Sequence, residues 1–177
     1  MEDHIILTGK KVILRAAERQ DQGMLLGLIR DPRIVKVTKG YQYAASGVHP
    51  AHGLCFLPVP AGSFRRVIAD REKPEAGLGM ILLSDIDEKS RMAQIHIKLL
   101  KSARGSGRGR DAVNVLTAYA FRQLGLGRIC ASILEDNLPS RKLFEACGFE
   151  QESTYESRAD QEGHCRSVCC YVRRKEA

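Results

Sequence analysis

Three glycines, three arginines and a lysine occur in the stretch KSARGSGRGRDA, residues 101–112. Glycine has no Cβ, so Gly105, Gly107 and Gly109 allow backbone conformations in which several amide N–H groups turn toward one point. Phosphate groups bind in such concavities, and the neighbouring cations favour them further. The stretch is therefore a candidate anion site.

Four kinds of site could use these glycines. A Walker phosphate loop ends in Gly-Lys-Ser/Thr, whereas this stretch continues as Gly109, Arg110 and Asp111. A dinucleotide fingerprint needs its third glycine where Arg110 stands, and it follows the first strand of its fold. An Arg-Gly RNA tract would be repetitive and interleaved with aromatic residues, but this single copy runs into a patterned apolar segment. The fourth kind is a pyrophosphate site at a helix N-terminus.

The flanking segments support the fourth interpretation. Apolar alternation predicts strands over residues 10–19, 63–71, 77–87, 92–100, 128–134 and 164–174, with a hairpin turn at 87–90. Helical spacing and stop signals predict helices within residues 18–32, 111–127 and 135–149, and a long loop over 41–63. The glycines thus lie between a strand and a helix, whose free N–H groups and positive dipole end would face an anion.

Length and composition indicate an ordinary globular protein. The chain has 177 residues, so we expect one domain over residues 1–177. It is 44% apolar and 28% charged, and we find no leader or membrane-spanning run, which predicts a cytoplasmic protein. The net charge of +7 permits nucleic acid as a partner, although a polyanionic small cofactor would explain part of this excess.

The cysteines and histidines do not form a complete metal motif. Without an export signal, the six cysteines are expected to remain reduced thiols that pack as small apolar groups. His49, His52 and Cys55 stand three residues apart, but no second ligand cluster completes a site. Whether these three bind a metal or form a polar loop stays open, and we expect no metal.

The glycine stretch resembles the acetyl-CoA signature of the GNAT N-acetyltransferase superfamily. That signature is Gln or Arg, two residues, Gly, one residue, then Gly or Ala, and Arg104, Gly107 and Gly109 match its three fixed positions. The resemblance therefore implies acetyl-CoA as cosubstrate.

A second block, NLPSRKLFEACGF, also resembles this family, through Asn137, Ser140 and the closing pair Gly148 and Phe149. The resemblance covers residues 11–172 and is nearest in style to the ribosomal-protein alanine and diamine acetyltransferases. It implies an α/β (α+β) fold, in which a mixed, mostly antiparallel sheet of about six to seven strands is flanked by helices. Strands of this sheet would splay around the cofactor.

The resemblance also assigns residues to parts of the cofactor. The strand end comprising Ile97, Lys98 and Leu99 would exchange backbone hydrogen bonds with the pantetheine. The pyrophosphate would lie against the stretch Arg104, Gly105, Ser106, Gly107, Arg108, Gly109 and Arg110. Asn137 and Ser140 would lie near the far side of the cofactor's arm.

Acetyl transfer to an amine needs a neutral nucleophile and stabilisation of a developing oxyanion. Relatives often carry a glutamate base on the strand before the glycines, where this chain has Gln94. His96 lies two residues later on the same face, and its ordinary pKa near 6.5 makes it the best local base candidate. A backbone N–H within residues 97–99 could stabilise the oxyanion without any particular side chain.

The departing thiolate also needs a proton. The diamine branch often uses a tyrosine for this step, and Phe144 stands at the matching position, where an apolar pattern also suits a core residue. Glu135, Asp136 and His164 are weaker candidates for the base. We therefore expect the thiolate to leave unassisted or to be protonated by water.

These residues are compatible with three functions. The first is an acetyl-CoA-dependent N-acetyltransferase acting on a primary amine, either a protein N-terminus or a small molecule, as a monomer or homodimer. The second is an acyl-CoA-binding module with weakened catalysis, suggested by Gln94 and Phe144. The third is a nucleic-acid-binding protein, which the dispersed basic residues make the least favoured.

Overall fold

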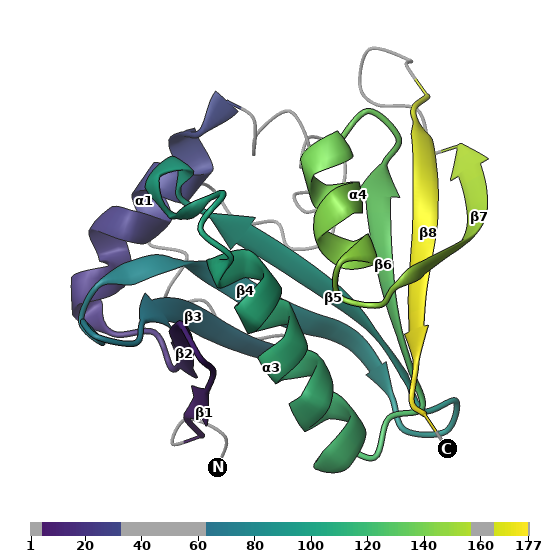
Figure 1. Cartoon of the computed structure of the whole chain (residues 1–177), viewed down its shortest axis with the longest axis horizontal. Coiled ribbons are helices and arrows are strands. Elements are labelled where there is room, and N and C mark those ends of the chain that lie inside the picture. The colour runs from purple at the N-terminus through teal and green to yellow at the C-terminus, as the bar shows by residue number, and fades with distance from the viewer. Residues whose placement is uncertain (1–4, 33–62, 157–164, 177) are drawn as a thin grey trace.

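The computed structural model describes residues 5–32, 63–156 and 165–176. Within these residues, eight strands form one sheet in the order β1-β2-β3-β4-β5-β6-β8-β7 (Figure 1). The strands are β1 (Leu7–Thr8), β2 (Val12–Arg15), β3 (Phe64–Asp70), β4 (Gly77–Asp87), β5 (Met92–Leu99), β6 (Arg128–Leu134), β7 (Glu150–Glu156) and β8 (Ser167–Arg174). The helices are α1 (Gln22–Arg30), α3 (Arg108–Arg122) and α4 (Leu138–Glu145), and 3-10 turns cover Arg19–Asp21 and Lys101–Ala103.

Every neighbouring pair of strands in this sheet is antiparallel except β5 and β6, which are parallel. The predicted turn at residues 87–90 is confirmed, because β4 ends at Asp87 and β5 begins at Met92. A parallel pair needs a crossover connection, and α3 supplies it between β5 and β6. The glycine stretch lies at the start of this crossover.

The core lies between the sheet and the helices α3 and α4, which cover the same face (Figure 1). The predicted helix within residues 111–127 is confirmed as α3, whose apolar stripe faces this core: Val113, Leu116 and Ala120 are fully buried and Leu124 packs against the same cluster. The helix is followed by Gly125 at φ +66°, the left-handed conformation expected of a glycine at this end. Burial of this stripe fixes α3, and therefore its N-terminus, against the sheet.

The sequence patterns did not predict two of the strands. Within the described residues the sheet therefore has eight strands, where six to seven were expected. The first, β1, has only two residues. The other, β7, is exposed at all seven positions and carries no apolar alternation. Helix α3 begins at Arg108, three residues before the predicted start at Asp111. The loop predicted for residues 41–63 lies almost entirely outside the described residues.

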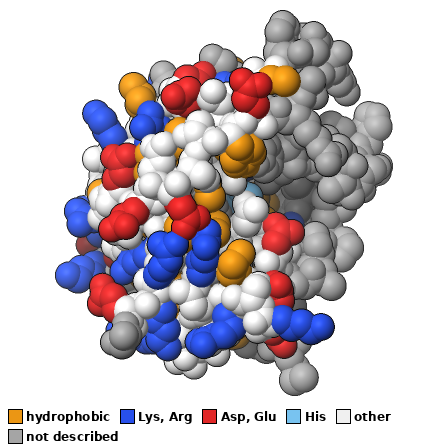
Figure 2. All heavy atoms as spheres, turned by 90° about the vertical axis from the view of Figure 1, so that its right-hand side faces the viewer, with side chains coloured by type: hydrophobic (Ala, Val, Ile, Leu, Met, Phe, Trp, Pro, Cys, Tyr) orange, Lys and Arg blue, Asp and Glu red, His pale blue; other side chains and the backbone are white. Residues whose placement is uncertain are grey.

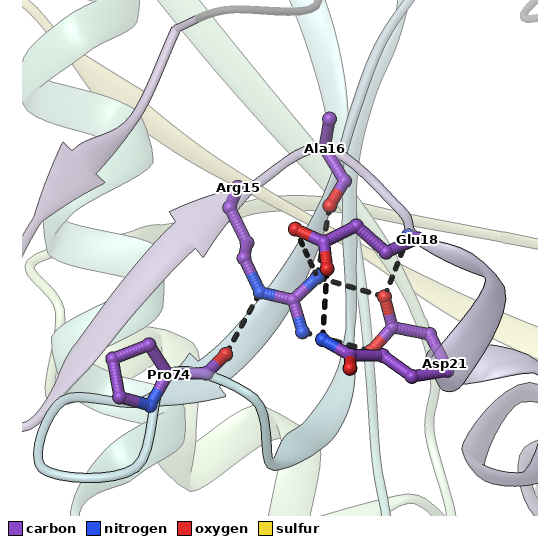
Figure 3. A network of polar contacts seen from close by, with 6 residues as sticks. Arg15, Ala16, Glu18, Asp21 and Pro74 are labelled. Carbon is purple, nitrogen blue, oxygen red and sulfur yellow. Dashed lines mark hydrogen bonds and ion pairs between the residues drawn. The ribbon is translucent and has the colours of Figure 1, made fainter.

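A buried ion pair fixes the start of α1 (Figure 3). Arg15 donates both terminal guanidinium nitrogens to Asp21, at 2.7 and 2.9 Å, and its Nε donates to the Pro74 carbonyl at 2.9 Å. Asp21 is only 1% exposed, and it also accepts the Glu18 N–H. The hydrogen bond to Asp21 raises the pKa of Arg15. Because its polar atoms have partners, the pair joins β2 to α1 without leaving a buried charge unpaired.

Candidate active site

The sheet splits open between β5 and β6. These strands pair only from Met92 to Gln94 on β5 and from Arg128 to Cys130 on β6, although both continue beyond. Past this seam, β5 still pairs with β4 and β6 still pairs with β8, so each strand is held from its outer side. Beyond Gln94 and Cys130 the two strands no longer pair with each other, and the glycine stretch follows this end of β5.

Backbone direction identifies the groups that face the split. Successive residues of a strand direct their N–H and C=O groups alternately to either side. Leu100 donates its N–H to Leu78 on β4, whereas the Leu99 carbonyl accepts two bonds from the Arg104 guanidinium, at 3.0 and 2.8 Å. Leu99 and, two residues before it, Ile97 therefore turn their backbone groups away from β4. Since Leu99 is occupied by Arg104, Ile97 offers the freer backbone to the split.

The glycines have two different roles. Gly105 and Gly107 adopt φ values of +75° and +81°, which confirms that the loop needs left-handed conformations that residues with a Cβ rarely adopt. Gly109 is instead buried in the first turn of α3, where a Cβ would lie 3.0 Å from Leu99 Cδ1. It lets the helix approach β5 closely. The expectation that all three glycines shape the loop backbone is therefore wrong for Gly109.

The N-terminus of α3 offers amide donors. Gly107 is its N-cap, and the next N–H to find a helical acceptor is that of Asp111, which bonds the Gly107 carbonyl at 3.1 Å. Among the described residues, nothing accepts a hydrogen bond from the N–H groups of Arg108, Gly109 or Arg110. Such a helix end, with its positive dipole, binds phosphate oxygens well.

The predicted cations differ in availability. The Arg104 guanidinium is held by Leu99 and by Asp31, 2.6 Å away. Arg108 pairs with Asp70 at 2.6 Å and also donates to Ser106 Oγ at 3.2 Å. Arg110 is exposed at the helix start. Arg104 and Arg108 thus brace the loop against β3, β5 and the end of α1.

Lys11 is a cation of this site that the sequence did not indicate. Its Nζ donates to the Ser106 carbonyl at 2.7 Å, and it lies 3.1 Å from the position that a Cβ on Gly107 would take. The residue comes from the turn between β1 and β2, which the motif does not include. An ammonium therefore stands beside the loop in addition to the arginines.

Asp111 anchors the helix start to that same turn. Its carboxylate accepts the N–H groups of Lys10 at 3.2 Å, Lys11 at 2.7 Å and Val12 at 3.1 Å. Gly9 approaches so closely that a Cβ there would lie 2.4 Å from the carboxylate. Asp111 therefore sets the position of Lys11 relative to the loop.

The Asn137 block forms a capped helix. Asn137 is the N-cap of α4 and its Oδ1 accepts the Ser140 N–H at 3.4 Å, while Gly148 adopts φ +76° after the helix ends. Phe144 is 2% exposed and meets Phe149 edge to face, with ring centroids 5.0 Å apart. Phe144 is therefore a core residue, as its apolar setting indicated.

His96 lies on the sheet face opposite α3 and α4. Its Nε2 is 2.9 Å from Ser84 Oγ, which in turn donates to the Asp85 carboxylate at 2.9 Å. Since a hydroxyl has one hydrogen and a carboxylate only accepts, Ser84 accepts from His96 Nε2–H, and the free lone pair of the ring is on Nδ1. Burial lowers the pKa of His96, with Asp85 opposing and Lys98 adding to the shift. His96 is therefore neutral at physiological pH.

The remaining candidates lie elsewhere. Gln94 stands at the end of the seam and accepts from Ser132 Oγ at 3.5 Å. Glu135 is exposed, and Asp136 pairs with Arg166 at 3.1 Å. His164 lies outside the described residues, as do His49, His52 and Cys55. Within the described ranges, we find no group of three or more His, Cys, Asp or Glu suited to a metal ion.

Comparison with known proteins settles the family. The model of the family described as "Acetyltransferase (GNAT) domain" matches residues 11–150. The chain belongs to the GNAT acetyltransferase family.

Named relatives of this GNAT chain are N-acetyltransferases. It is 34% identical over 71 residues to an "N-acetyltransferase 9-like protein" of Caenorhabditis briggsae, covering 39% of this chain and 36% of the relative. It is 32% identical over 75 residues to the human "Alpha/beta-tubulin-N-acetyltransferase 9", covering 42% of this chain and 36% of the relative. The chain thus spans about a third of the length of these relatives.

Solved structures confirm the GNAT fold. A GNAT-family acetyltransferase from Bacillus anthracis superposes with a TM-score of 0.80 at 15% identity, over 96% of this chain and 98% of the other. Spermidine N-acetyltransferase from Vibrio cholerae, in complex with CoA and spermine, superposes with a TM-score of 0.75 at 23% identity, over 92% and 95%. The predicted mixed, mostly antiparallel sheet with flanking helices is therefore confirmed.

Two further observations bear on partners of this GNAT chain. Lys/Arg and Asp/Glu side chains are interspersed over β7 and β8 (Figure 2), where Glu152 pairs with both Arg128 and Arg174. This face is not the continuous basic patch that nucleic acid would favour. In the part of the chain that the structure describes, no helix has the length and apolar character needed to cross a membrane.

Proposed function

We propose that this GNAT chain is a single acetyltransferase domain that transfers the acetyl group of acetyl-CoA to a primary amine. The observation that carries the proposal is the open split between β5 and β6, which leads to the unpaired amides at the start of α3. An elongated ligand with a pyrophosphate at one end and a thioester at the other fits this arrangement.

The loop residues fit the pyrophosphate. The N–H groups of Arg108, Gly109 and Arg110 would donate to its oxygens, and Lys11 and the Arg110 side chain would add positive charge. Arg104 and Arg108 would act mainly by bracing the loop, because their guanidinium groups already pair with Asp31 and Asp70. The pantetheine would lie in the split and exchange backbone hydrogen bonds with Ile97.

The remaining family positions contribute less directly. Lys98 lies on the His96 face of β5, where burial lowers its pKa. Asn137 caps α4 by accepting the Ser140 N–H, so these two residues fix the start of that helix. The start of α4 would border the cofactor's arm.

His96 would accept the proton of the attacking amine, directly or through water. Its Nδ1 carries the free lone pair, and the lowered pKa keeps the ring neutral below the ordinary value near 6.5. The acid limb of kcat/KM should therefore lie below pH 6.5. His96→Gln should lower kcat roughly 100-fold and remove this limb. An unchanged acid limb in that variant would assign the base elsewhere.

The acceptor is an amine of a protein N-terminus or of a small molecule. One named relative acts on tubulin and one structural neighbour holds spermine, so both classes belong in the test. We would incubate the full chain with labelled acetyl-CoA and a panel of peptides, polyamines and aminosugars, and measure free thiol release. Acetyl-CoA binding without turnover on the whole panel would favour the binding module instead.

A further inference from the structure

Two hydroxyl groups, those of Tyr155 and Ser132, form a chain of hydrogen bonds that ends at Gln94 beside the split. This chain lies on the sheet face that carries His96. Tyr155 of β7 donates its hydroxyl to Ser132 Oγ at 3.3 Å, and Ser132 of β6 donates to Gln94 Oε1 at 3.5 Å. Three strands, β7, β6 and β5, therefore contribute to one chain of hydrogen bonds. Both hydroxyls donate in the same direction, from the outer strand toward the seam.

Ser132 occupies a particular position in this chain. The last β6 residue paired with β5 is Cys130, and Ser132 is the next residue on the same face, just beyond the seam. His96 holds the equivalent position on β5, two residues beyond Gln94. The proposed base His96 and the hydroxyl of Ser132 therefore lie on the two strands that border the split, each two residues beyond the last paired residue of its strand.

Tyr155 lies partly at the protein surface. The residue is 42% exposed, and its hydroxyl donates to Ser132. A hydroxyl at such a position can recover a proton from water after giving one away. Phe144 cannot serve in this way, because its ring is buried and carries no proton to donate.

We propose that Ser132 donates a proton to the departing thiolate and that Tyr155 resupplies Ser132. This inference rests on the proposed acetyltransferase function. The amine nitrogen bonds to the acetyl carbon as the C–S bond breaks, and the electron pair leaves with sulfur. Sulfur takes the Ser132 proton, Ser132 takes the Tyr155 proton, and Tyr155 takes one from water. The amine's own proton passes through His96 to solvent, so the products are the amide and free CoA thiol.

Other titratable groups face these hydroxyls and must be separated from them. They are the thiols of Cys130 and Cys170 on β6 and β8, and Glu152 on β7 with its partners Arg128 and Arg174. Burial raises the pKa of Cys170, so loss of its thiol proton could also contribute to an alkaline limb. Cys170→Ala is therefore the matched control.

The test compares pH profiles of kcat in the full chain and its variants, with melting temperatures to confirm folding. The parent should lose activity at alkaline pH, where hydroxide removes the proton that the relay passes on. Tyr155→Phe should remove this limb and lower kcat roughly 10-fold, less than typical general acid effects because a thiolate leaves readily. Cys170→Ala should keep the limb.

A second pair of variants tests the proton donor itself. Ser132→Ala should lower kcat at least as much as Tyr155→Phe with KM for acetyl-CoA unchanged, and Ser132→Thr should retain activity. An alkaline limb that persists in Tyr155→Phe, or that disappears in Cys170→Ala, overturns the relay while the acetyltransferase function stands. Absence of turnover by the parent on the whole amine panel overturns both proposals.

Discussion

Replacing Asp111 tests the anchor between α3 and the β1–β2 turn. The carboxylate accepts three backbone N–H groups, those of Lys10, Lys11 and Val12. Asp111→Ala removes all three acceptors, whereas Asp111→Asn keeps one oxygen. Placed at the Oδ2 position, that oxygen can still accept from Lys11 and Val12, and the exposed Lys10 amide can turn to water.

The expected cost follows from the surroundings of each donor. The Val12 residue is fully buried, so its orphaned amide should cost about 1 to 3 kcal/mol. The exposed lysine amides recover hydrogen bonds from water and should add less, about 0.5 kcal/mol each. We therefore expect Asp111→Ala to lose about 3 kcal/mol, which is roughly 6 to 12 °C in Tm for a chain of this length. Asp111→Asn should lose about 1 kcal/mol, because two neutral bonds remain.

Denaturant titration and thermal melting would measure these losses, with acetyl-CoA calorimetry on the same samples. Asp87→Ala is the matched control, since Asp87 also accepts backbone N–H groups, from Lys89 and Ser90, but in an exposed turn away from the site. The control should lose less stability and keep its acetyl-CoA affinity. Equal losses for Asp111→Ala and Asp87→Ala, or for Asp111→Ala and Asp111→Asn, would refute this account of the anchor.

Three further predictions concern single residues. Gly107→Val should abolish acetyl-CoA binding in calorimetry and lower stability by at least about 1 to 2 kcal/mol, because φ is +81° and the new Cβ would crowd Lys11; unchanged affinity in a folded variant would contradict the loop's role. Phe144→Tyr should lower Tm without raising turnover, since it buries an unpaired hydroxyl at about 1 to 3 kcal/mol, and a faster enzyme would contradict this. Cys147, whose pKa burial raises to about 11, should resist alkylation at pH 8 while the exposed Cys165 reacts, as peptide mass spectrometry can check.

Sequence patterns predicted the structural features that depend on residues close together in the sequence. The helices within residues 111–127 and 135–149 and the turns at Gly105 and Gly107 follow from residue type and spacing, and the structure confirms them. The close approach of Gly109 to β5 is a tertiary contact, so the glycine spacing alone suggested a wrong reason for it.

Contacts between distant segments left no signal in the sequence. Asp111 and the amide of Lys11 are 100 residues apart, and Tyr155 and Ser132 are 23 apart on strands whose pairing the sequence does not specify. Tyr155 was also hidden because β7 is polar throughout and shows no alternation. Side chains that complete a motif from outside it therefore require the fold.

The split between β5 and β6 also divides the chain in sequence order. The strands β1 to β5 all precede α3, and β6, β7 and β8 all follow it, so each half-sheet is built from one continuous part of the chain. Only three residue pairs form the hydrogen-bonded seam between the halves. A ligand lying in the split would act as a surrogate strand that both halves share, and its release would uncouple them. Amide hydrogen exchange should then slow in both half-sheets together when acetyl-CoA binds, even in β6, which is remote in sequence from the glycine loop.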